Sequence, residues 1–373
     1  MTPRERILAG INHERVDKLP SDMWVTPEIM EALLAHFGID AGKDADKGSV
    51  TFNGGKVSAD PKAILALWDE LDIDGILNVA PPYNGPELEE RNGIVYNEWG
   101  FGYEKQRYGS GTYLEQVSYP MAELETIDDL KRYPWPDPDW YDYEALPGLI
   151  ERCKGRAVNV GYTAVFYFHN LLRGLEQSLI DTVASPDFTR YLVGRVSDFF
   201  HEYHTRCFEA AGDLIDTTQV TDDFGSQHGL LISPEVFRAF YQDPMQKAMD
   251  LAKRSGIKVF HHDDGDLREL LPDLVEMGID VLNPIQYKCG DWDLGALKAE
   301  YGDRICFHSG VDNQDVLPFG SPEDVKAEVK KLVDTLGRDG TGYIVCSSHN
   351  IQPNTPVENV VALYEAAREY GVG

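Results

Sequence analysis

Short apolar runs that read as buried strands recur along the chain, and a helix-like segment follows each of them. This alternation predicts parallel strands joined by helical crossovers, and eight such units in 373 residues favour a (β/α)8 barrel. A doubly wound open sheet shows the same alternation and is the structural alternative, although it usually needs fewer strands. The runs are 18–24, 74–80, 157–162, 214–220, 257–262, 279–285, 304–310 and 343–348.

Several predicted helices begin with Ser-Pro or Thr-Pro, in "TPRE", "TPEI", "SPEV", "SPED" and "TPVE". The hydroxyl can cap the first turn, and proline presets φ for the helix. An acid three residues after Thr2, Ser321 and Thr355 predicts a capping box at each of these starts.

The segment from about 81 to 143 breaks this rhythm. It alternates aromatic and polar residues around Asn92-Gly93 and Gly109-Ser110-Gly111, which predicts antiparallel hairpins inserted after the second strand. We therefore expect one domain over residues 1–373 with a β-hairpin insertion. The insertion could roof a pocket or form the face of a homodimer, since aromatic content alone does not decide.

The chain is acidic, with a net charge of -29, which disfavours nucleic acid and anionic membrane surfaces as partners. Its five cysteines include no C-x-x-C pair, as expected of a reduced setting. The start "MTPRERILAGINHERVDKLP" is not typical of a signal peptide, and no apolar stretch reaches the length of a membrane span. These features predict a cytoplasmic protein.

Polar residues follow most of the predicted strands, where a barrel of this kind places its catalytic groups. For a single Asp or Asn, a role in ending the strand is at least as good an explanation. Histidine has no special role in turns, so the recurrence of histidine favours a functional pocket. We expect catalytic roles for Asp222, Asp223, His262 and His308, and substrate contacts from Asp22, Gln227, His261, Asn283, Gln286 and Asp312.

The stretch "HHDDG" ends the fifth predicted strand. Because side chains alternate along a strand, His262 and Asp264 should share one face, and His261 and Asp263 the other. With His349 after the eighth strand as a third ligand, this H-x-D pair can hold a divalent metal ion. Without a metal, the same three groups could bind and protonate a substrate. Cys346, also near the predicted rim, is more typical of packing.

The whole chain resembles the uroporphyrinogen decarboxylase superfamily, and in particular its corrinoid-linked, methyltransferase-like branch. The matching stretches include "DDFGSQHGLLISPEVFRAF", "FHHDDGDLRELLPDLVEMGIDVLNPIQ" and "FHSGVDNQDVLPFG". The resemblance implies a (β/α)8 barrel. Decarboxylases of this family carry an arginine-rich segment after the first strand that clamps the porphyrinogen carboxylates. Here that region reads "SDMWVTPEIMEALLAHFG", without arginine, so porphyrinogen decarboxylation is not expected.

Methyltransferases of the family hold zinc with an H-x-C pair and a distant Cys, and the positions that resemble these are His262, Asp264 and His349. Such a harder ligand set suits an oxygen-bearing substrate better than a thiol. The resemblance thus implies methyl transfer from a small methoxylated or N-methylated donor to cobalamin on a separate corrinoid protein. A metal-assisted decarboxylase or lyase acting on a small acid is the alternative. A non-catalytic binding protein fits less well, because binding pockets are mostly apolar.

Overall fold

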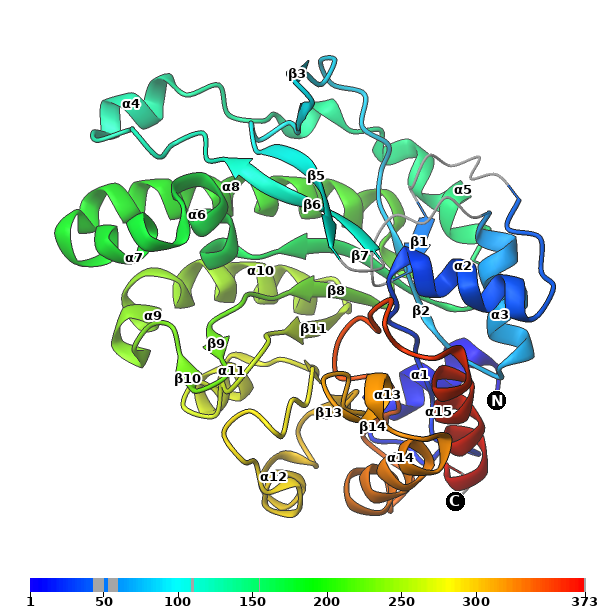
Figure 1. Cartoon of the computed structure of the whole chain (residues 1–373). Helices are drawn as coiled ribbons and strands as arrows, with labels where there is room; N and C mark the ends of the chain where they lie inside the picture. The colour runs from blue at the N-terminus through cyan, green and yellow to red at the C-terminus, as the bar shows by residue number, and fades with distance from the viewer. Residues whose placement is uncertain (43–49, 53–59, 109–110, 154, 372–373) are drawn as a thin grey trace.

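A curled sheet forms the centre of the computed structural model, which describes residues 1–42, 50–52, 60–108, 111–153 and 155–371 (Figure 1). Neighbouring strands are parallel from β2 to β14, whereas β1 pairs antiparallel with β2. The spatial order is β1 (Val50–Phe52), β2 (Ile76–Val79), β7 (Ala157–Thr163), β8 (Thr217–Val220), β11 (Lys258–His262), β12 (Val281–Asn283), β13 (Cys306–His308) and β14 (Tyr343–Ile344).

The first predicted strand, 18–24, is wrong as a regular strand, and β1 takes a place in the sheet that the sequence did not predict. Residues 20–26 nevertheless lie between β14 and the start of β2. Val345 N donates to Pro20 O (2.8 Å), and Gly75 N donates to Ser21 O (2.9 Å). The ladder is irregular because the Asp22 carboxylate, rather than a backbone carbonyl, accepts from Ile76 N (2.9 Å).

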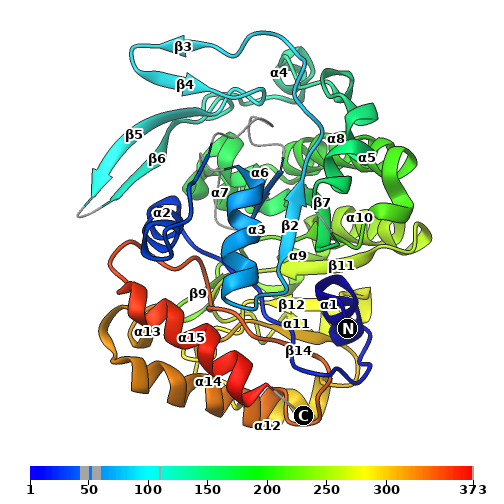
Figure 2. The same cartoon turned by 90° about the vertical axis from the view of Figure 1, so that its right-hand side faces the viewer.

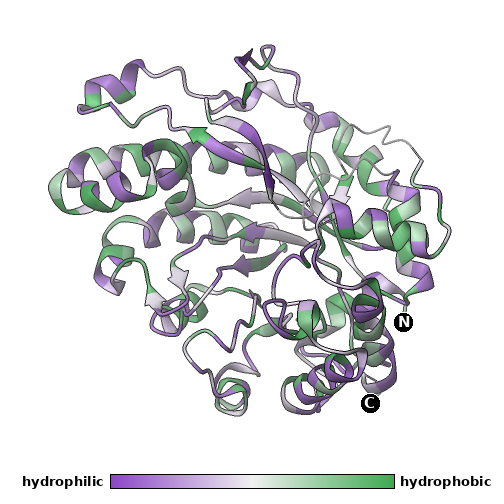
Figure 3. Cartoon of the chain, in the orientation of Figure 1, coloured by the Kyte–Doolittle hydropathy of each residue, from purple (hydrophilic) through white to green (hydrophobic). Residues whose placement is uncertain are grey.

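Helices cover the outside of the curled sheet (Figure 2). They carry both hydrophobic and hydrophilic residues (Figure 3). Among the described residues, no helix combines the length and apolarity needed to span a bilayer. The helices are α1 (Pro3–Ile11), α2 (Pro27–His36), α3 (Pro61–Glu70), α5 (Leu146–Glu151), α6 (Val165–Arg173), α7 (Leu175–Ala184), α8 (Pro186–Ala211), α9 (Pro234–Phe240), α10 (Gln242–Arg254), α11 (Leu271–Met277), α12 (Leu294–Tyr301), α13 (Val316–Phe319), α14 (Pro322–Leu336) and α15 (Val357–Tyr370).

The capping boxes at Thr2 and Ser321 are confirmed, whereas the one at Thr355 is wrong. Helix α15 begins at Val357 with Pro356 as its N-cap, so the helix starts one residue later than the Thr-Pro pattern predicts. The Thr355 hydroxyl therefore lies one position too early, and its buried Oγ1 has no hydrogen-bond partner among the described residues.

The segment between β2 and β7 contains a second, antiparallel sheet in the order β3 (Glu90–Arg91), β4 (Ile94–Tyr96), β5 (Gly102–Tyr108), β6 (Gly111–Ser118), followed by α4 (Ile127–Arg132). Asn92 and Gly93 turn the first hairpin with positive φ values of 55° and 81°. Residues 109 and 110 of the other expected turn lie outside the described residues. Arg173 ties this insertion to α7, because it donates to Leu124 O (2.8 Å) and to Asp181 Oδ2 (2.7 Å).

The interior of the curled sheet is layered. A compact apolar cluster contains Ile7, Ile11, Trp24, Ile76, Ala157, Phe260, Val281, Cys306, Ile344 and Cys346. Residues two positions further along a strand point to the same face, so a polar layer follows the apolar one. In β11, β12 and β13 that layer consists of His262, Asn283 and His308, and it begins the candidate site. Cys346 packs in the apolar layer, as its sequence context predicted.

Candidate active site

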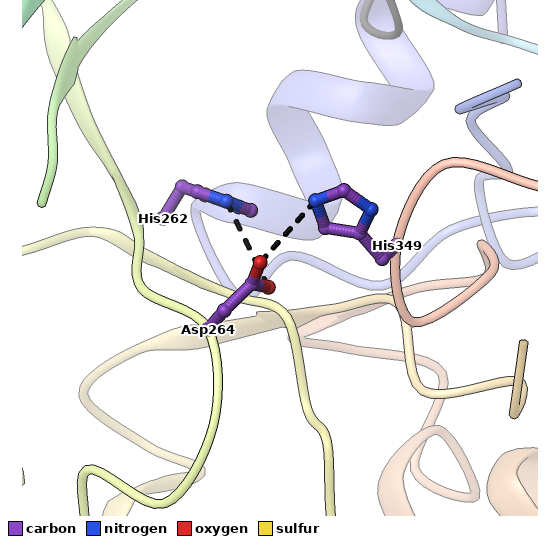
Figure 4. Close-up of side chains that lie close together, drawn as sticks. All are labelled: His262, Asp264 and His349. Carbon is purple, nitrogen blue, oxygen red and sulfur yellow. Dashed lines mark ion pairs between the residues drawn. The ribbon is translucent and has the colours of Figure 1, made fainter. Parts of the chain in front are cut away.

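The three residues expected to bind metal converge at the C-terminal end of the parallel strands (Figure 4). His262 ends β11, Asp264 follows it, and His349 comes from the loop after β14. Asp264 lies between the two imidazoles, 3.8 Å from His262 Nε2 and 3.3 Å from His349 Nε2. One ligand atom from each residue lies within 4.8 Å of the others. Each side chain remains partly accessible, as a site that receives a ligand requires.

A buried hydrogen-bonded chain, here called the relay, leads from Asp22 through His308 and Asn283 to His262. Asp22 Oδ2 lies 3.0 Å from His308 Nε2, and it also accepts from Trp24 Nε1 at 2.9 Å. On its other side His308 Nδ1 lies 2.8 Å from Asn283 Nδ2, and Asn283 Oδ1 lies 2.6 Å from His262 Nδ1. The relay joins the polar layer into one connected network.

The relay fixes which nitrogen of His262 faces the cluster. The Asp22 carboxylate accepts only, so His308 Nε2 donates to it, and His308 Nδ1 accepts from the Asn283 amide nitrogen. The Asn283 oxygen then faces His262 and accepts from its Nδ1–H. This leaves Nε2 of His262 as the nitrogen directed at Asp264, with its lone pair available when the imidazole is neutral. Metal-binding histidines are held in this way by a partner on the other ring nitrogen.

The carboxylate of Asp264 is also held in place. Gln286 Nε2 donates to Asp264 Oδ1 (3.1 Å), and Gln286 Oε1 accepts from Gly265 N (2.7 Å). Burial lowers the pKa of His262, but the charges of Asp264 and Asp223 and the bond to Asn283 outweigh it and leave that pKa raised. Burial lowers the pKa of His349. The charge of Asp264 opposes this lowering, and His262 adds to it.

Two carboxylates after β8 have different environments. Asp222 is fully buried and accepts from Phe166 N (3.0 Å) and Tyr167 N (2.6 Å) in the first turn of α6, so it orients that helix. Asp223 is partly exposed, and its buried Oδ1 has no hydrogen-bond partner among the described residues. Burial raises the pKa of Asp223 to about 7, with His262 opposing and Asp263 and Asp264 adding to the rise. Asp223 and His262 therefore interact electrostatically, each affecting the pKa of the other.

His261 and Asp263 take the face opposite to the cluster, as strand alternation predicted. His261 Nδ1 donates to Val220 O (2.8 Å), and Asp263 Oδ1 accepts from Phe224 N (2.9 Å) and Gly225 N (3.0 Å). Both side chains are fully buried. The structure thus places His261 among packed elements and away from the cluster, although the sequence analysis expected it to contact substrate.

A polar cavity of about 530 Å³ opens over the cluster and is lined by Asp264, His349, Gln227 and Gln286. Gln227 also accepts from Cys289 Sγ (3.2 Å). Asp312 lies outside this lining; its carboxylate accepts from Lys288 Nζ (2.5 Å) and from Val316 N (3.1 Å). The structure therefore brings Gln227 and Gln286 to the cluster, and it places Asp312 in a neighbouring loop network.

A second cavity, of about 360 Å³, lies over β2, β7 and β8. A pocket under the insertion was one of two alternatives left open by the sequence, which identified none of its residues. Trp99 from the insertion and Phe199, Phe200 and Tyr203 from α8 contribute to its walls. In the sequence these aromatic residues resemble ordinary core positions, and they become neighbours only after the insertion folds over α8. No local pattern marked them as a site.

Comparison with known proteins places these features in context. The family model for uroporphyrinogen decarboxylase (URO-D) matches residues 107–370, which is more than half of the chain. Uroporphyrinogen decarboxylase of Coxiella burnetii is 24% identical over 194 residues, covering 50% of this chain and 49% of the relative. The chain thus matches about half the length of this relative. That of Herminiimonas arsenicoxydans is 24% identical over 277 residues, covering 70% of this chain and 71% of the relative.

One solved structure matches over nearly its full length. It is described as "methyltransferase from Methanosarcina mazei", is 18% identical and covers 99% of both chains, with a TM-score of 0.65. This likeness establishes a shared fold.

Proposed function

We propose, from the premise that this chain belongs to the uroporphyrinogen decarboxylase (URO-D) family, that it is a corrinoid-linked methyltransferase. It would move a methyl group from a small methoxylated or N-methylated donor to cobalamin carried by a separate protein. The observation that carries this proposal is the cluster of His262, Asp264 and His349, oriented from behind by the relay and open to a polar cavity.

The cluster fits a divalent metal, for which zinc is our proposal. Two imidazoles and a carboxylate, with a further position open to solvent, form the type of ligand set found in catalytic zinc sites. His262 presents Nε2 because the relay occupies Nδ1, and Gln286 holds Asp264. When bound, such a metal supplies Lewis acidity that polarises the leaving atom of the donor.

The remaining roles follow from the positions of the side chains. Asp223 interacts electrostatically with His262, and we assign to it the proton that the leaving oxygen of a methoxylated donor needs as the methyl departs. Gln227 lines the polar cavity over the cluster, and we assign it contacts with the leaving group of the donor at the metal. Asp222 and His308 are fully buried and hydrogen-bonded, so we propose that they position other groups instead of contacting the substrate.

The charge of the residues that line the cavities favours this proposal over porphyrinogen decarboxylation, the activity named for the curated relatives. A tetrapyrrole with several carboxylates needs cations to hold it. Neither of the two cavities described above has an Arg or Lys among its described lining residues. The name of the Methanosarcina mazei protein is compatible with methyl transfer but identifies no substrate.

Methyl transfer is tested by incubating the purified protein with cob(I)alamin and a panel of methoxylated and N-methylated donors. We expect the absorbance change of cobalt methylation with at least one donor. No change across the panel, with decarboxylation of small acids under the same conditions, would instead establish the alternative of a metal-assisted lyase.

Metal binding is tested separately, by elemental analysis of protein purified without a histidine tag. We expect close to stoichiometric zinc in the wild type and loss of zinc in His262→Ala. His228→Ala is the matched control, because His228 is exposed and lies outside the cluster. Equal metal content in both variants would remove the proposed metal site.

A further inference from the structure

The second cavity is close to the cluster but chemically different from it. Gln219 lines this cavity and pairs in register with Phe260, two residues before His262. Asn159, one strand further, lines it too. The volume of about 360 Å³ is within the range of small-molecule sites. Gln219 therefore connects this cavity to the neighbouring strand β11, which carries His262.

One side of the cavity, here called the aromatic wall, consists of Trp99, Tyr141, Phe168, Phe199, Phe200 and Tyr203. The rings pack against one another: the Trp99 centroid lies 4.9 Å from that of Phe168 and 4.8 Å from that of Phe199, both edge to face. The Asn97 side chain fixes the turn before the wall, because its Oδ1 accepts from Trp99 N (3.1 Å). The wall is thus a preformed surface of aromatic rings.

A carboxylate accompanies these rings without a cation. Glu98 lines the cavity, and its Oε1 accepts from the Tyr141 hydroxyl at 2.9 Å. Across the described part of the chain Glu98 makes no ion pair, and the cavity lining includes neither Arg nor Lys. A partly buried carboxylate beside aromatic rings is stabilised by a cation, and aromatic faces attract cations through their quadrupole.

The opposite side of the cavity is polar. Asn159 and Gln219 contribute side-chain amides from β7 and β8, and Tyr162 adds a phenol. The Asn159 oxygen accepts from Thr217 Oγ1 (3.0 Å) and its nitrogen donates to Gly161 O (3.4 Å), so a ligand oxygen would be met by the second N–H of this amide. Amides of this kind bind hydroxyl or carbonyl oxygens. The cavity therefore matches a ligand with a cationic, apolar end and a hydrogen-bonding end.

We propose that this cavity binds a methylated ammonium compound, with the ammonium group against the aromatic wall and Glu98, and a polar oxygen toward Asn159 and Gln219. This proposal rests on the proposed function in one respect: the ammonium compound is taken to be the methyl donor of that reaction. The binding itself does not depend on the metal cluster, so the two proposals fail independently.

Choline is a suitable probe. Its uncharged isostere, the dimethylbutanol in which a carbon atom replaces the ammonium nitrogen, (CH3)3C–CH2CH2OH, has nearly the same shape. Calorimetric titration of the full chain, with and without EDTA, should show choline binding at least about 10-fold tighter than the isostere, in line with a desolvated cation–π contact. Glu98→Gln should reduce this preference, and the part that remains is the contribution of the aromatic wall. Glu87→Gln is the matched control, because Glu87 is an exposed carboxylate of the same insertion that does not line this cavity.

The wall is tested with Tyr203→Leu and Tyr203→Phe. The leucine variant should weaken choline binding roughly 3- to 30-fold, whereas the phenylalanine variant keeps the ring face and the affinity. Equal affinity for choline and the isostere, no saturable choline binding by folded protein, or a preference for a neutral methoxylated aromatic compound would each overturn the proposal. Loss of zinc binding in His262→Ala without loss of choline binding would show that the two sites are separate.

Discussion

Replacing Asp22 with Asn should weaken metal binding even though Asp22 does not touch the cluster. The carboxylate accepts from Ile76 N, Trp24 Nε1 and His308 Nε2. An asparagine side chain has one oxygen, so its NH2 group must face some of these donors. If it faces His308, that imidazole has to accept at Nε2 and carry its proton on Nδ1.

The change then passes along the relay. A proton on His308 Nδ1 meets the amide nitrogen of Asn283, which must rotate and present its NH2 to His262 Nδ1. His262 is left with its proton on Nε2, the nitrogen that faces Asp264. Metal binding must displace this proton and leave one buried hydrogen bond unmade, at a cost of about 1–3 kcal/mol. The expected loss of affinity is therefore roughly 10- to 100-fold, the usual range for partners of metal-binding histidines.

The affinity can be measured by competition for zinc with a chromophoric chelator at constant pH. Tyr364→Phe is the matched control, because Tyr364 donates to the backbone oxygen of Asp22 (3.0 Å) and its removal leaves the carboxylate contacts intact. Asn283→Leu should produce a loss similar to that of Asp22→Asn. Since both act through His262, the double variant should lose little more than either single one.

Zinc affinity within a factor of two of the wild type in a folded Asp22→Asn variant would refute the relay as the origin of the orientation of His262. Strict additivity of the two substitutions would refute it as well, because independent effects would mean that Asp22 does not act through Asn283.

Three further predictions concern stability. Burial and nearby His201 lower the pKa of His204 to about 3, so on acidification the unfolded state binds this proton before the folded state does. Between pH 7.5 and 5.5 the free energy of unfolding, measured by urea titration, should fall by roughly 1.4 kcal/mol more in the wild type than in His204→Gln. Equal losses in the two proteins would contradict this. Arg173→Leu leaves Asp181 buried without its cation and should cost about 3–5 kcal/mol; a change below 1 kcal/mol in chemical denaturation would rule this out. Ser321→Ala should cost about 1 kcal/mol and Thr355→Ala less, since only the first hydroxyl caps a helix; the reverse order of melting temperatures would argue against the two cap assignments.

The fold was largely predictable because seven of the eight predicted runs contain a strand of the curled sheet. The exception, 18–24, has the right apolar pattern, but its partners are irregular: a carboxylate at Asp22 replaces a carbonyl in the ladder. Strand β1 has only three residues and pairs antiparallel, so neither its length nor its pattern distinguishes it from a loop. Both differences depend on contacts between distant segments.

In the candidate site, too, the sequence predicted some features and missed others. Alternation along β11 was enough to place His262 and Asp264 on one face, and the barrel hypothesis brought His349 to them. It did not reveal that Asp22, His308 and Asn283 bond to one another, because strand patterns give the direction of a side chain and not its partner. The aromatic wall was missed for a related reason, since its residues come from the insertion, α6 and α8 and look like core in each.

Asp22 and His308, which meet at 3.0 Å, are separated by 286 positions in the sequence. A loop of that length closes only when most of the molecule is assembled, and nothing local preserves the contact if one part opens. Occupancy of the metal cluster should therefore report cooperative folding of the whole chain, so that proteolytic fragments carrying "HHDDG" alone would lack the oriented imidazole and bind no better than a flexible peptide.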